Sequence, residues 1–408
     1  MSRVDELIAE LVPEGVEIRT LGDVGQFVRG NGLQKSDLTD EGAPAIHYGQ
    51  VHTHYGVWAE TTKSFTDPEY AVRLRRAKPG DLVIATTSED DAAVAKATAW
   101  LGESEAAVSG DAYIYRHELD PKYVAYFFGS TMFQDQKARH ITGTKVRRVS
   151  GDALAKIRIP VPPIEVQREI VRILDKFTSL EAELEAELEA RKRQYAHYRS
   201  LNLTFDADTP RVPLGDVVEV RSGWGFPNAH QGATDGEFPF YKVSDMNLLG
   251  NETVMSRANN YVSLEVARSL GVRAAPAGSI IFPKIGAAVA TNKKRILSMP
   301  SAYDNNVMAL IPRERVASRF LYHWMQTFNL SKLANDSGAV PSIRKSEVEQ
   351  TVMPLPNMDD QIRIADLLDR FDIIVNDLSS GLPAEIAARR KQYAYYRDKL
   401  FTFEEAAS

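Results

Sequence analysis

The chain has 408 residues, a formal net charge of −6, 44% hydrophobic residues, 25% charged residues and no cysteine. This composition is typical of a soluble globular protein with two or three domains, and it excludes disulfides, thiol catalysis and thiolate metal ligands. No apolar run is long enough to span a membrane, and the N-terminus has no secretory signal, so we expect a cytoplasmic protein.

The first domain is expected at residues 1–160 and mixes short strands with one aromatic-rich helix. Runs such as DLVIATT (81–87) and AYIYR (112–116) are rich in β-branched or aromatic residues and are bounded by turn-forming residues. KYVAYFFGSTMF (122–133) is expected to form a single helix. Its aromatic side chains are interpreted as part of the core, and not as ligand contacts.

The first connector, residues 161–205, is predicted to form one long amphipathic helix over residues 164–202. Pro160, Pro162 and Pro163 stand just before this helix and no proline lies inside it. About 36 helical residues would span about 54 Å. Apolar side chains recur along one face at steps of three, four or seven, namely Ile170, Leu174, Phe177, Leu180, Leu184, Leu188, Tyr195 and Tyr198.

The second domain is expected at residues 206–355 and has the same mixed character. GSIIFPKIG (278–286) and NNVMALI (305–311) are predicted to form strands, and RFLYHWMQTF (319–328) is predicted to form a helix. The two domains agree at their edges and diverge in their centres, which indicates one scaffold with two specificities.

The second connector, residues 356–404, is also predicted to be helical, and a short tail follows at 405–408. SSGLP (379–383) interrupts it, and Gly381 and Pro383 predict a break or kink there. Its apolar stripe contains Ile364, Leu367, Leu368, Phe371, Ile374, Leu378, Ile386, Tyr393, Tyr396 and Leu400.

The two halves therefore repeat the same segments in the same order. LGDV occurs at 21–24 and 214–217, IPVPPIEVQREIVRILDKF (159–177) corresponds to MPLPNMDDQIRIADLLDRF (353–371), and RKRQYAHYRSLNLTF (191–205) corresponds to RRKQYAYYRDKLFTF (389–403). A repeat of about 200 residues is too long for a solenoid. We predict an α+β protein in which two similar globular domains are joined by two long helices, packed as an antiparallel coiled coil. Such a protein should bind something that itself has two parts.

Motifs for catalysis are absent from the sequence. It contains no GxxxxGKS/T phosphate loop, no HExxH zinc motif and no GxSxG nucleophile motif. His52 and His54 are interpreted as a surface pair, and Glu89, Asp90 and Asp91 as a solvated acidic loop. We assign no catalytic residue, no cofactor and no metal site, and interpret the chain as a recognition module.

Two stretches, residues 136–151 and 266–303, carry basic residues and no acidic residue. Residues 21–160 hold 17 basic and 18 acidic residues, whereas residues 209–353 hold 16 and 12. Phosphate contacts need cations without competing carboxylates, so these stretches predict contacts to nucleic acid. Together with GAVPSIRK (338–345), they supply the candidates Lys137, Arg139, Lys145, Arg147, Arg148, Lys284, Lys293, Lys294, Arg295, Arg344 and Lys345.

The repeated segments closely resemble a known family. IPVPPIEVQREIVRILDKF followed by LEAELEAELEARKRQYAHYR, and the second copy ending LPAEIAARRKQYAYYRDKLFTF, are similar to the conserved regions of type I restriction–modification specificity (S) subunits. LGDV, FPFYKVSDMN and GSIIFPKIGA resemble the edges of that family's target-recognition domains. The resemblance covers essentially the whole chain, and its order, spacing and duplication all agree.

The resemblance implies a non-catalytic subunit of a DNA methyltransferase and restriction complex. Each target-recognition domain would read one half of a bipartite site in double-stranded DNA. The paired helices would set the spacer and dock two methyltransferase (M) subunits, and the complex would recruit restriction and translocation (R) subunits. No cofactor and no membrane partner is implied.

Two other interpretations remain open at this point. The chain could be the recognition subunit of a methyltransferase that lacks a nuclease partner. A two-headed coiled-coil scaffold for proteins would also explain the duplication, but it would not need basic loops free of acidic residues.

Overall fold

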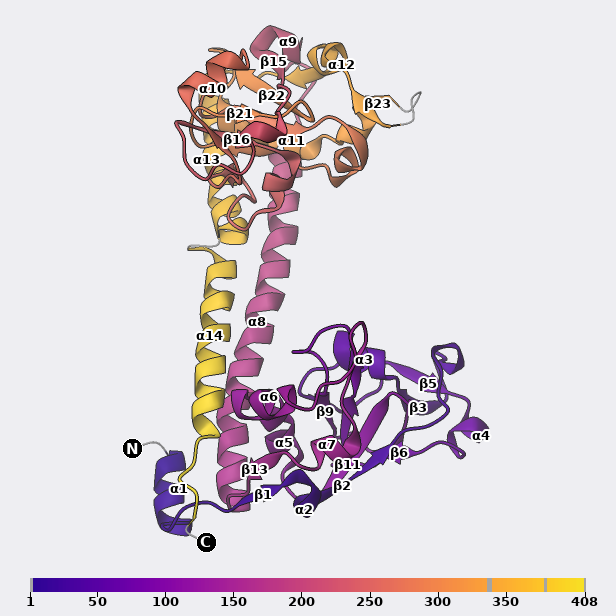
Figure 1. The fold of residues 1–408 in the computed structure, drawn as a ribbon. Coiled ribbons are helices and arrows are strands. Elements are labelled where there is room, and N and C mark those ends of the chain that lie inside the picture. The colour runs from indigo at the N-terminus through magenta and orange to yellow at the C-terminus, as the bar shows by residue number, and fades with distance from the viewer. Residues whose placement is uncertain (1–2, 336–339, 378–379, 407–408) are drawn as a thin grey trace. The chain divides into compact units, whose positions relative to one another are not determined.

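The computed structural model describes residues 3–335, 340–377 and 380–406. Contacts divide the chain into two compact units, which we call unit 1 (Met1–Ala182 with Arg389–Ser408) and unit 2 (Glu183–Ala388) (Figure 1). Each unit takes in parts of both connectors. The finer division into two domains, two connectors and a tail stays a prediction.

Unit 1 is built on two sheets whose strands are short and largely buried. The five-stranded sheet has the order β2 (Gly25–Arg29), β11 (Ala112–His117), β7 (Leu82–Ala85), β9 (Lys96–Trp100) and β4 (Trp58–Ala59). The four-stranded sheet has the order β5 (Ser64–Thr66), β3 (Ala43–Ile46), β10 (Ala106–Val108) and β6 (Arg76–Ala77). The β4–β9 and β3–β10 pairs are parallel and the other pairs are antiparallel.

Two smaller strand pairs complete the sheets of unit 1, β1 (Ile18–Thr20) with β13 (Arg158–Pro160), and β8 (Thr87–Ser88) with β12 (Arg147–Arg148). The helices of unit 1 before the first connector are α1 (Arg3–Leu11), α2 (Leu21–Val24), α3 (Tyr48–Thr53), α4 (Pro68–Ala71), α5 (Pro121–Phe128), α6 (Thr131–Ala138) and α7 (Gly151–Leu154). A 3-10 turn, η1, covers Lys35–Asp37.

The single helix predicted over 122–133 is wrong, because the chain forms α5 and α6 with a break between them. The hydroxyl of Ser130 accepts a hydrogen bond from the Phe133 amide at 3.3 Å and so caps a new helix. The aromatic side chains do belong to the core, as predicted. Tyr123 and Phe127 are fully buried and pack with Ile170 of the first connector.

Unit 2 repeats the five-stranded sheet and has a second sheet with one strand fewer. Its five-stranded sheet has the order β15 (Val218–Ser222), β22 (Val307–Pro312), β19 (Ile280–Pro283), β20 (Arg295–Leu297) and β17 (Val254–Met255). Its second sheet has the order β18 (Tyr261–Val262), β16 (Phe238–Tyr241) and β21 (Ala302–Tyr303). The β17–β20 and β16–β21 pairs are parallel, like their counterparts in unit 1.

The remaining elements of unit 2 are short. They are the pairs β14 (Arg211–Pro213) with β25 (Val352–Pro354) and β23 (Ala334–Asn335) with β24 (Ser342–Ile343), the helices α9 (Leu214–Val217), α10 (Leu264–Ser269), α11 (Ser318–Thr327) and α12 (Lys345–Gln350), and the 3-10 turns η2 (Asn228–His230), η3 (Val243–Asn247), η4 (Gly286–Thr291) and η5 (Leu330–Leu333). The predicted strands at 278–286 and 305–311 and the predicted helix at 319–328 are confirmed.

The first connector forms one helix, α8 (Ile164–Asn202), as predicted. None of the eight side chains of its predicted apolar stripe is exposed. The second connector forms α13 (Met358–Asn376) and α14 (Leu382–Leu400), so the predicted break is confirmed, while Leu378 and Ser379 lie outside the described residues. Gly381 suits the break because a β-carbon there would lie 2.4 Å from the Ile373 carbonyl oxygen.

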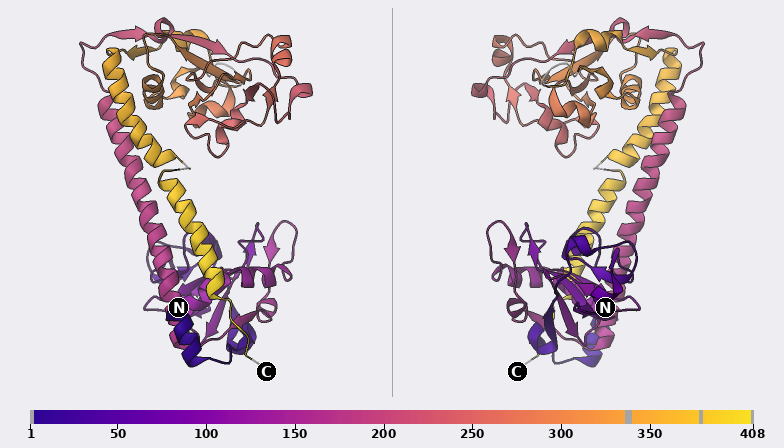
Figure 2. Two further views of the ribbon diagram at one scale, coloured as in Figure 1. Left: turned by 90° about the vertical axis from the view of Figure 1, so that its left-hand side faces the viewer. Right: turned by 90° about the vertical axis from the view of Figure 1, so that its right-hand side faces the viewer.

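The connectors pack antiparallel within each unit. In unit 1, Phe177 of α8 stacks on Tyr396 of α14, and Glu181, further along α8, pairs with Arg390, which comes earlier in α14, at 2.6 Å. The two helices therefore run in opposite directions. Both views of Figure 2 draw the C-terminal part of α14 beside α8. In unit 2, Tyr198 stacks on Phe371 of α13. The predicted α+β class with paired antiparallel helices is confirmed.

Candidate nucleic-acid interface

Several loops of unit 1 leave its five-stranded sheet at the same end. Strand pairing sets Arg29 beside Tyr113, Ala112 beside Ala85, and Ala85 beside Lys96. The segments after β2, after β7 and before β11 therefore leave the sheet at the same end. We call this the loop end of unit 1.

Helix α3 and strands β8 and β12 join the same loop end. The Nε2 atom of His52 donates to the Thr87 carbonyl oxygen at 2.8 Å, and Thr87 pairs with Arg148 across β8 and β12. The Lys96 ammonium group donates to the carbonyl oxygens of His52 and Tyr55 at 3.2 and 3.0 Å. His52, interpreted from the sequence as part of a surface pair, therefore holds α3 against this end.

Three of the predicted residues in unit 1 are exposed cations. The side chains of Arg139, Lys145 and Arg148 have no hydrogen-bond or ion-pair partner within the described part of the chain. Arg147 is different, because it pairs with Asp91 at 2.8 Å and donates to the Gly143 carbonyl at 2.6 Å. Arg147 therefore braces the loop that presents Lys145 and Arg148 to solvent.

Lys137 is wrong as a phosphate contact, because its side chain is 1% exposed. Its ammonium group donates to the carbonyl oxygens of Asp91, Ala92 and Val94 at 2.8, 3.1 and 2.9 Å, and also to the side chain of Gln134. Burial lowers the pKa of this ammonium group to about 8, against the opposing effect of nearby acidic residues. Lys137 holds the turn before β9, where Ala95 has a φ of +63°.

Lys294 in unit 2 is wrong for the same reason. It is fully buried and donates to the Phe328 carbonyl at 2.6 Å and to the Asn292 side chain at 2.8 Å. Asn292 has a φ of +54° and precedes β20 as Ala95 precedes β9. The two units thus stabilise the same left-handed turn with a buried lysine, which comes from α6 in unit 1 and from the segment just before β20 in unit 2.

The other predicted residues of unit 2 gather at the equivalent loop end. Lys284 follows β19 directly, and its carbonyl accepts a hydrogen bond from the Ile343 amide, which brings Arg344 close by. Arg344 and Lys345 are exposed, and Lys345 pairs with Glu349 at 3.5 Å. Lys293 contacts Asn247, whereas Arg295 is half-buried and donates to the carbonyls of Lys294 and Met246.

We expect the Lys137→Met variant to lose about 2–4 kcal/mol of unfolding free energy, because several buried acceptors lose their donor. The folded-state pKa of about 8 lies below the ordinary 10.5, so the unfolded chain binds more protons between these values. This lysine therefore adds stability as the pH rises through that range, a gain that the variant should lack.

Thermal and urea unfolding of both proteins between pH 7 and 10 would measure these two effects. Arg139→Met, at an exposed position close by in the sequence, is the matched control and should change stability by less than about 0.5 kcal/mol. A Lys137→Met protein with unchanged stability but weakened DNA binding would contradict the structural role.

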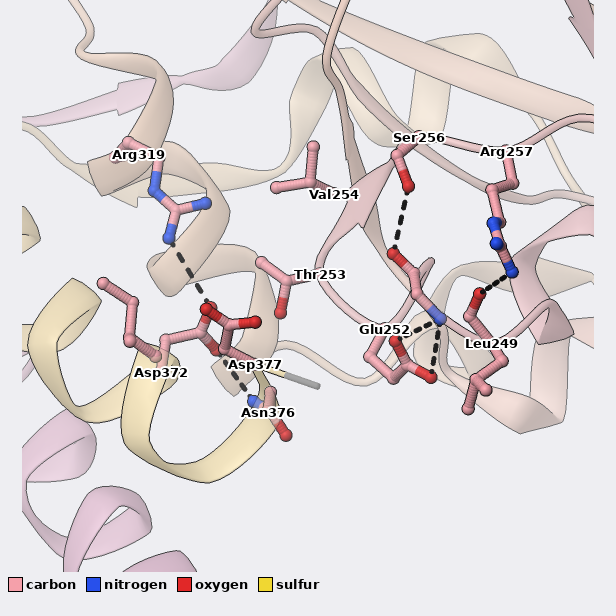
Figure 3. Close-up of a pocket in the computed structure, with 12 residues that line it drawn as sticks. Leu249, Glu252, Thr253, Val254, Ser256, Arg257, Arg319, Asp372, Asn376 and Asp377 are labelled. Atoms are coloured by element: carbon pink, nitrogen blue, oxygen red, sulfur yellow. Dashed lines mark hydrogen bonds and ion pairs between the residues drawn. The ribbon is translucent and has the colours of Figure 1, made fainter. Parts of the chain in front are cut away.

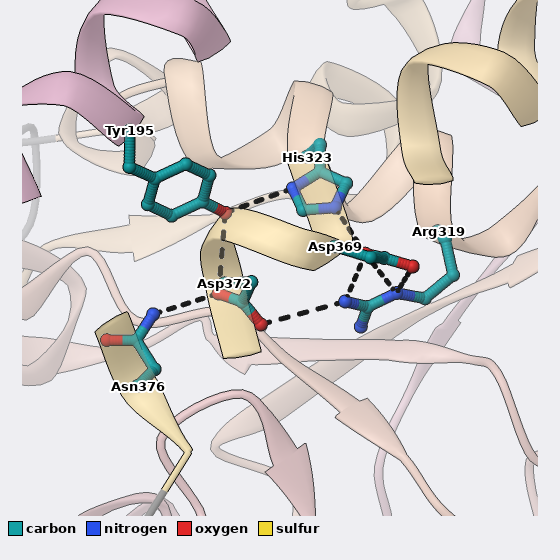
Figure 4. A network of polar contacts seen from close by, with 6 residues as sticks. All are labelled: Tyr195, Arg319, His323, Asp369, Asp372 and Asn376. Atoms are coloured by element: carbon teal, nitrogen blue, oxygen red, sulfur yellow. Dashed lines mark hydrogen bonds and ion pairs between the residues drawn. The ribbon is translucent and has the colours of Figure 1, made fainter. Parts of the chain in front are cut away.

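A buried polar network joins the connectors to the domain of unit 2 (Figure 4). Arg319 of α11 donates to both carboxylate oxygens of Asp369, at 2.8 and 2.9 Å, and His323 contacts the same carboxylate at 2.6 Å. The hydroxyl of Tyr195 on α8 contacts His323 at 3.2 Å and Asp372 at 3.3 Å. Although burial opposes the change, the hydrogen bonds from His323 and Arg319 lower the pKa of Asp369.

Unit 1 contains the same arrangement with other side chains. Lys122 of α5 pairs with Asp175 of α8 at 2.8 Å, and the Tyr126 hydroxyl donates to the same carboxylate at 2.7 Å. Tyr126 also packs edge-on against Tyr393 of α14. Both networks therefore tie the domain of their unit to the paired helices.

A cavity of about 780 Å³ in unit 2 lies between the loop of residues 249–257 and α13 (Figure 3). Arg319 and Asp372 line it, and so does Val254 of β17. The position of Val254 is occupied in unit 1 by Trp58, whose ring lies 4.1 Å from the Lys122 ammonium group. Among the described residues no three His, Asp or Glu side chains are grouped to hold a metal ion.

Two similar α+β domains with cationic loop ends, each tied to antiparallel helices, define a duplicated recognition protein. The chain matches the Type I restriction modification DNA specificity domain twice, at residues 13–190 and 208–388, and it belongs to that family. The resemblance noted in the sequence is confirmed, and the chain is a type I restriction–modification specificity subunit.

Named relatives agree with this assignment. The chain is 32% identical over 294 residues to the specificity subunit of the type I restriction enzyme EcoR124I/EcoR124II of Escherichia coli, covering 69% of this chain and 70% of the relative. It is 28% identical over 280 residues to a putative type I specificity subunit of Haemophilus influenzae, covering 64% and 68%.

Solved structures share the fold. The S subunit of a type I restriction–modification system from M. genitalium aligns over 94% of this chain and 96% of its own, with a TM-score of 0.55 at 14% identity. A chain from a study of complex assembly and conformational transition of the type I R-M system aligns over 95% and 97%, with a TM-score of 0.60 at 16% identity. Among the residues that the structure describes, no helix is long and apolar enough to cross a membrane.

Proposed function

We propose that this chain is the non-catalytic DNA-specificity subunit of a type I complex, in which each loop end reads one half of a bipartite site. The observation that carries this proposal is the repeated topology with different loops. The strand order of the five-stranded sheet is the same in both units, while the segments at their loop ends differ in sequence and length. A shared scaffold with different loops suits the reading of two different half-sites.

Accessible cations at each loop end would contact phosphate groups. In unit 1 these are Lys145 and Arg148, joined by Arg139 from the end of α6, and in unit 2 they are Arg344 and Lys345, joined by the half-buried Lys293. Lysine and arginine side chains fix the register of a protein on DNA, while other groups read the bases. Lys284 is half-buried at the same end and would support this surface.

The paired helices would set the distance between the half-sites and dock the methyltransferase subunits. Helix α13 supports docking because Met358, Ile362 and Ile373 are exposed by 37%, 47% and 51%. At 100° per residue these side chains fall within a sector of about 60° on the helix. An apolar face of this kind on a charged helix suits a partner protein, and two connectors suit two such partners.

The test is co-expression of the chain with its methyltransferase partner, followed by mapping of modified bases across the host genome. We expect one bipartite motif with a spacer of constant length, and no modification or cleavage by the purified chain alone. A continuous motif would contradict the two-headed reading. Activity of the isolated chain would contradict the non-catalytic role, and absence of any salt-sensitive DNA binding would favour a protein scaffold.

We expect the Lys145→Ala/Arg148→Ala variant to bind all DNA sequences more weakly in the methyltransferase complex. Removing two phosphate contacts should reduce the slope of log affinity against log salt concentration by about 2. Lys156→Ala is the matched control, because Lys156 is exposed near Gly22 at the opposite end of the sheet. DNA-binding titrations between 50 and 200 mM salt, roughly the range over which such contacts are resolved, would measure this change. The assignment would be contradicted if the Lys145→Ala/Arg148→Ala variant, like the control, matched the wild type in affinity and salt slope.

A further inference from the structure

The loop end of unit 1 contains a recess of about 700 Å³, and none of the exposed cations Arg139, Lys145 and Arg148 lines it. The end of β2, the turn after β3 and the turn between β10 and β11 form it, and its polar lining includes Arg29, Lys35, His47 and Asp111. Gly30 forms part of the floor, where a β-carbon would lie 2.2 Å from the Ser109 carbonyl oxygen. The backbone at Gly30 therefore packs directly against the backbone at Ser109, and a larger residue at position 30 would displace this part of the recess.

His47 presents one hydrogen-bond donor to this recess. Its Nδ1 atom accepts a hydrogen bond from the Gly49 amide at 3.2 Å. Burial lowers the pKa of His47, so near neutral pH the ring is uncharged and carries its single proton on Nε2. The adjacent carboxylate of Asp111 opposes this shift and the Lys35 ammonium group adds to it, so both charges lie near the imidazole.

Lys35 and Asp111 supply a second donor and an acceptor. The Lys35 side chain has no hydrogen-bond or ion-pair partner within the ranges that the structure describes. Arg29 donates from Nε to the Gly110 carbonyl at 2.8 Å, and its Nη2 atom lies 3.9 Å from Asp111. Arg29 thus positions the turn that carries Asp111, while the Asp111 side chain stays half-exposed.

We propose that this recess reads the major-groove edge of a G·C base pair in the half-site bound by unit 1. Lys35 and His47 donate to the two acceptors of guanine, N7 and O6, and Asp111 accepts from the N4 amino group of cytosine. A carboxylate within the recess would repel a phosphate group, which favours a base edge over the DNA backbone. This inference rests on the proposed function.

In unit 2, the counterparts of His47 and Asp111 are both hydrogen-bonded to other side chains. Parallel strands β16 and β21 align with β3 and β10, which makes Lys242 the counterpart of His47 and Asn306 the counterpart of Asp111. The Lys242 ammonium group donates to the Gln231 side chain at 2.7 Å, and the Asn306 amide donates to Asp304 at 3.2 Å. The G·C-reading recess therefore belongs to unit 1, and unit 2 must read its half-site differently.

The test uses the complex with the methyltransferase partner and a DNA library in which each base pair of both half-sites is varied. Lys35→Ala and His47→Asn should each lose discrimination at one and the same G·C position, by about tenfold or more. Asparagine at position 47 keeps a side-chain acceptor for the Gly49 amide, so the turn is preserved. Asp111→Asn should relax the same position, whereas the matched control Lys242→Ala should leave it unchanged.

Three outcomes would overturn the inference while the proposed function stands. They are a wild-type half-site without a G·C pair, unchanged preference in all three variants, and uniform weakening at every position with a smaller salt slope, which would mark phosphate contacts. Thermal unfolding of each variant complex separates these outcomes from loss of folding. A wild-type complex that recognises no bipartite site would instead overturn the proposed function itself.

Discussion

Exchanging residues 21–160 for the corresponding segment of another specificity subunit is expected to replace one half-site completely and to leave the other half-site unchanged. The segment contains both sheets of unit 1 and its whole loop end. The core of unit 2 contains no residue of this segment. Because the two domains have separate cores, each domain should determine its own half-site independently of the other.

Mapping of modified bases in cells that express the hybrid and the methyltransferase partner would measure this effect. The hybrid must keep the contacts of α5 with the first connector, where Tyr123 and Phe127 pack with Ile170 and Leu174. A donor segment with aromatic residues at those two positions is the suitable choice, and its thermal unfolding is the control. A folded hybrid that changes both half-sites would contradict modular recognition.

Adding one LEAE unit to LEAELEAELEA at 180–190 is expected to lengthen the unspecified spacer by about one or two base pairs. Four helical residues add about 6 Å and rotate the remainder of the helix by only about 40°, so the leucine face is kept. Base pairs are spaced by about 3.4 Å along DNA, which sets the expected change in spacer. Both half-site sequences should stay the same, because neither loop end is altered.

The same genome-wide mapping of modified bases tests this prediction. Deletion of one LEAE unit should shorten the spacer or abolish modification. A companion variant with four residues added between α13 and α14 as well keeps the two connectors matched in length, and it controls for strain in the helix pair. An active insertion variant with an unaltered spacer would contradict the proposal that the helices set the distance.

The sequence alone determined the duplication, the helical connectors and the family. These features depend on local patterns that a chain displays directly, such as the apolar stripe of α8 and the break at Gly381. Helix periodicity is a property of neighbouring residues, so the helix that the sequence predicts agrees with the observed α8. The aromatic-rich helix over 122–133 was predicted as one element because the capping role of Ser130 is only weakly visible beside a strong apolar run.

Only the tertiary structure decided which charged residues are available to a partner. Lys137 and Lys145 look alike in the sequence, yet one is buried against backbone carbonyls and the other is exposed. Burial depends on residues distant in sequence, and so does the recess that brings Lys35, His47 and Asp111 together from three separate segments. Strand pairing creates that proximity, and no local pattern in the chain encodes it.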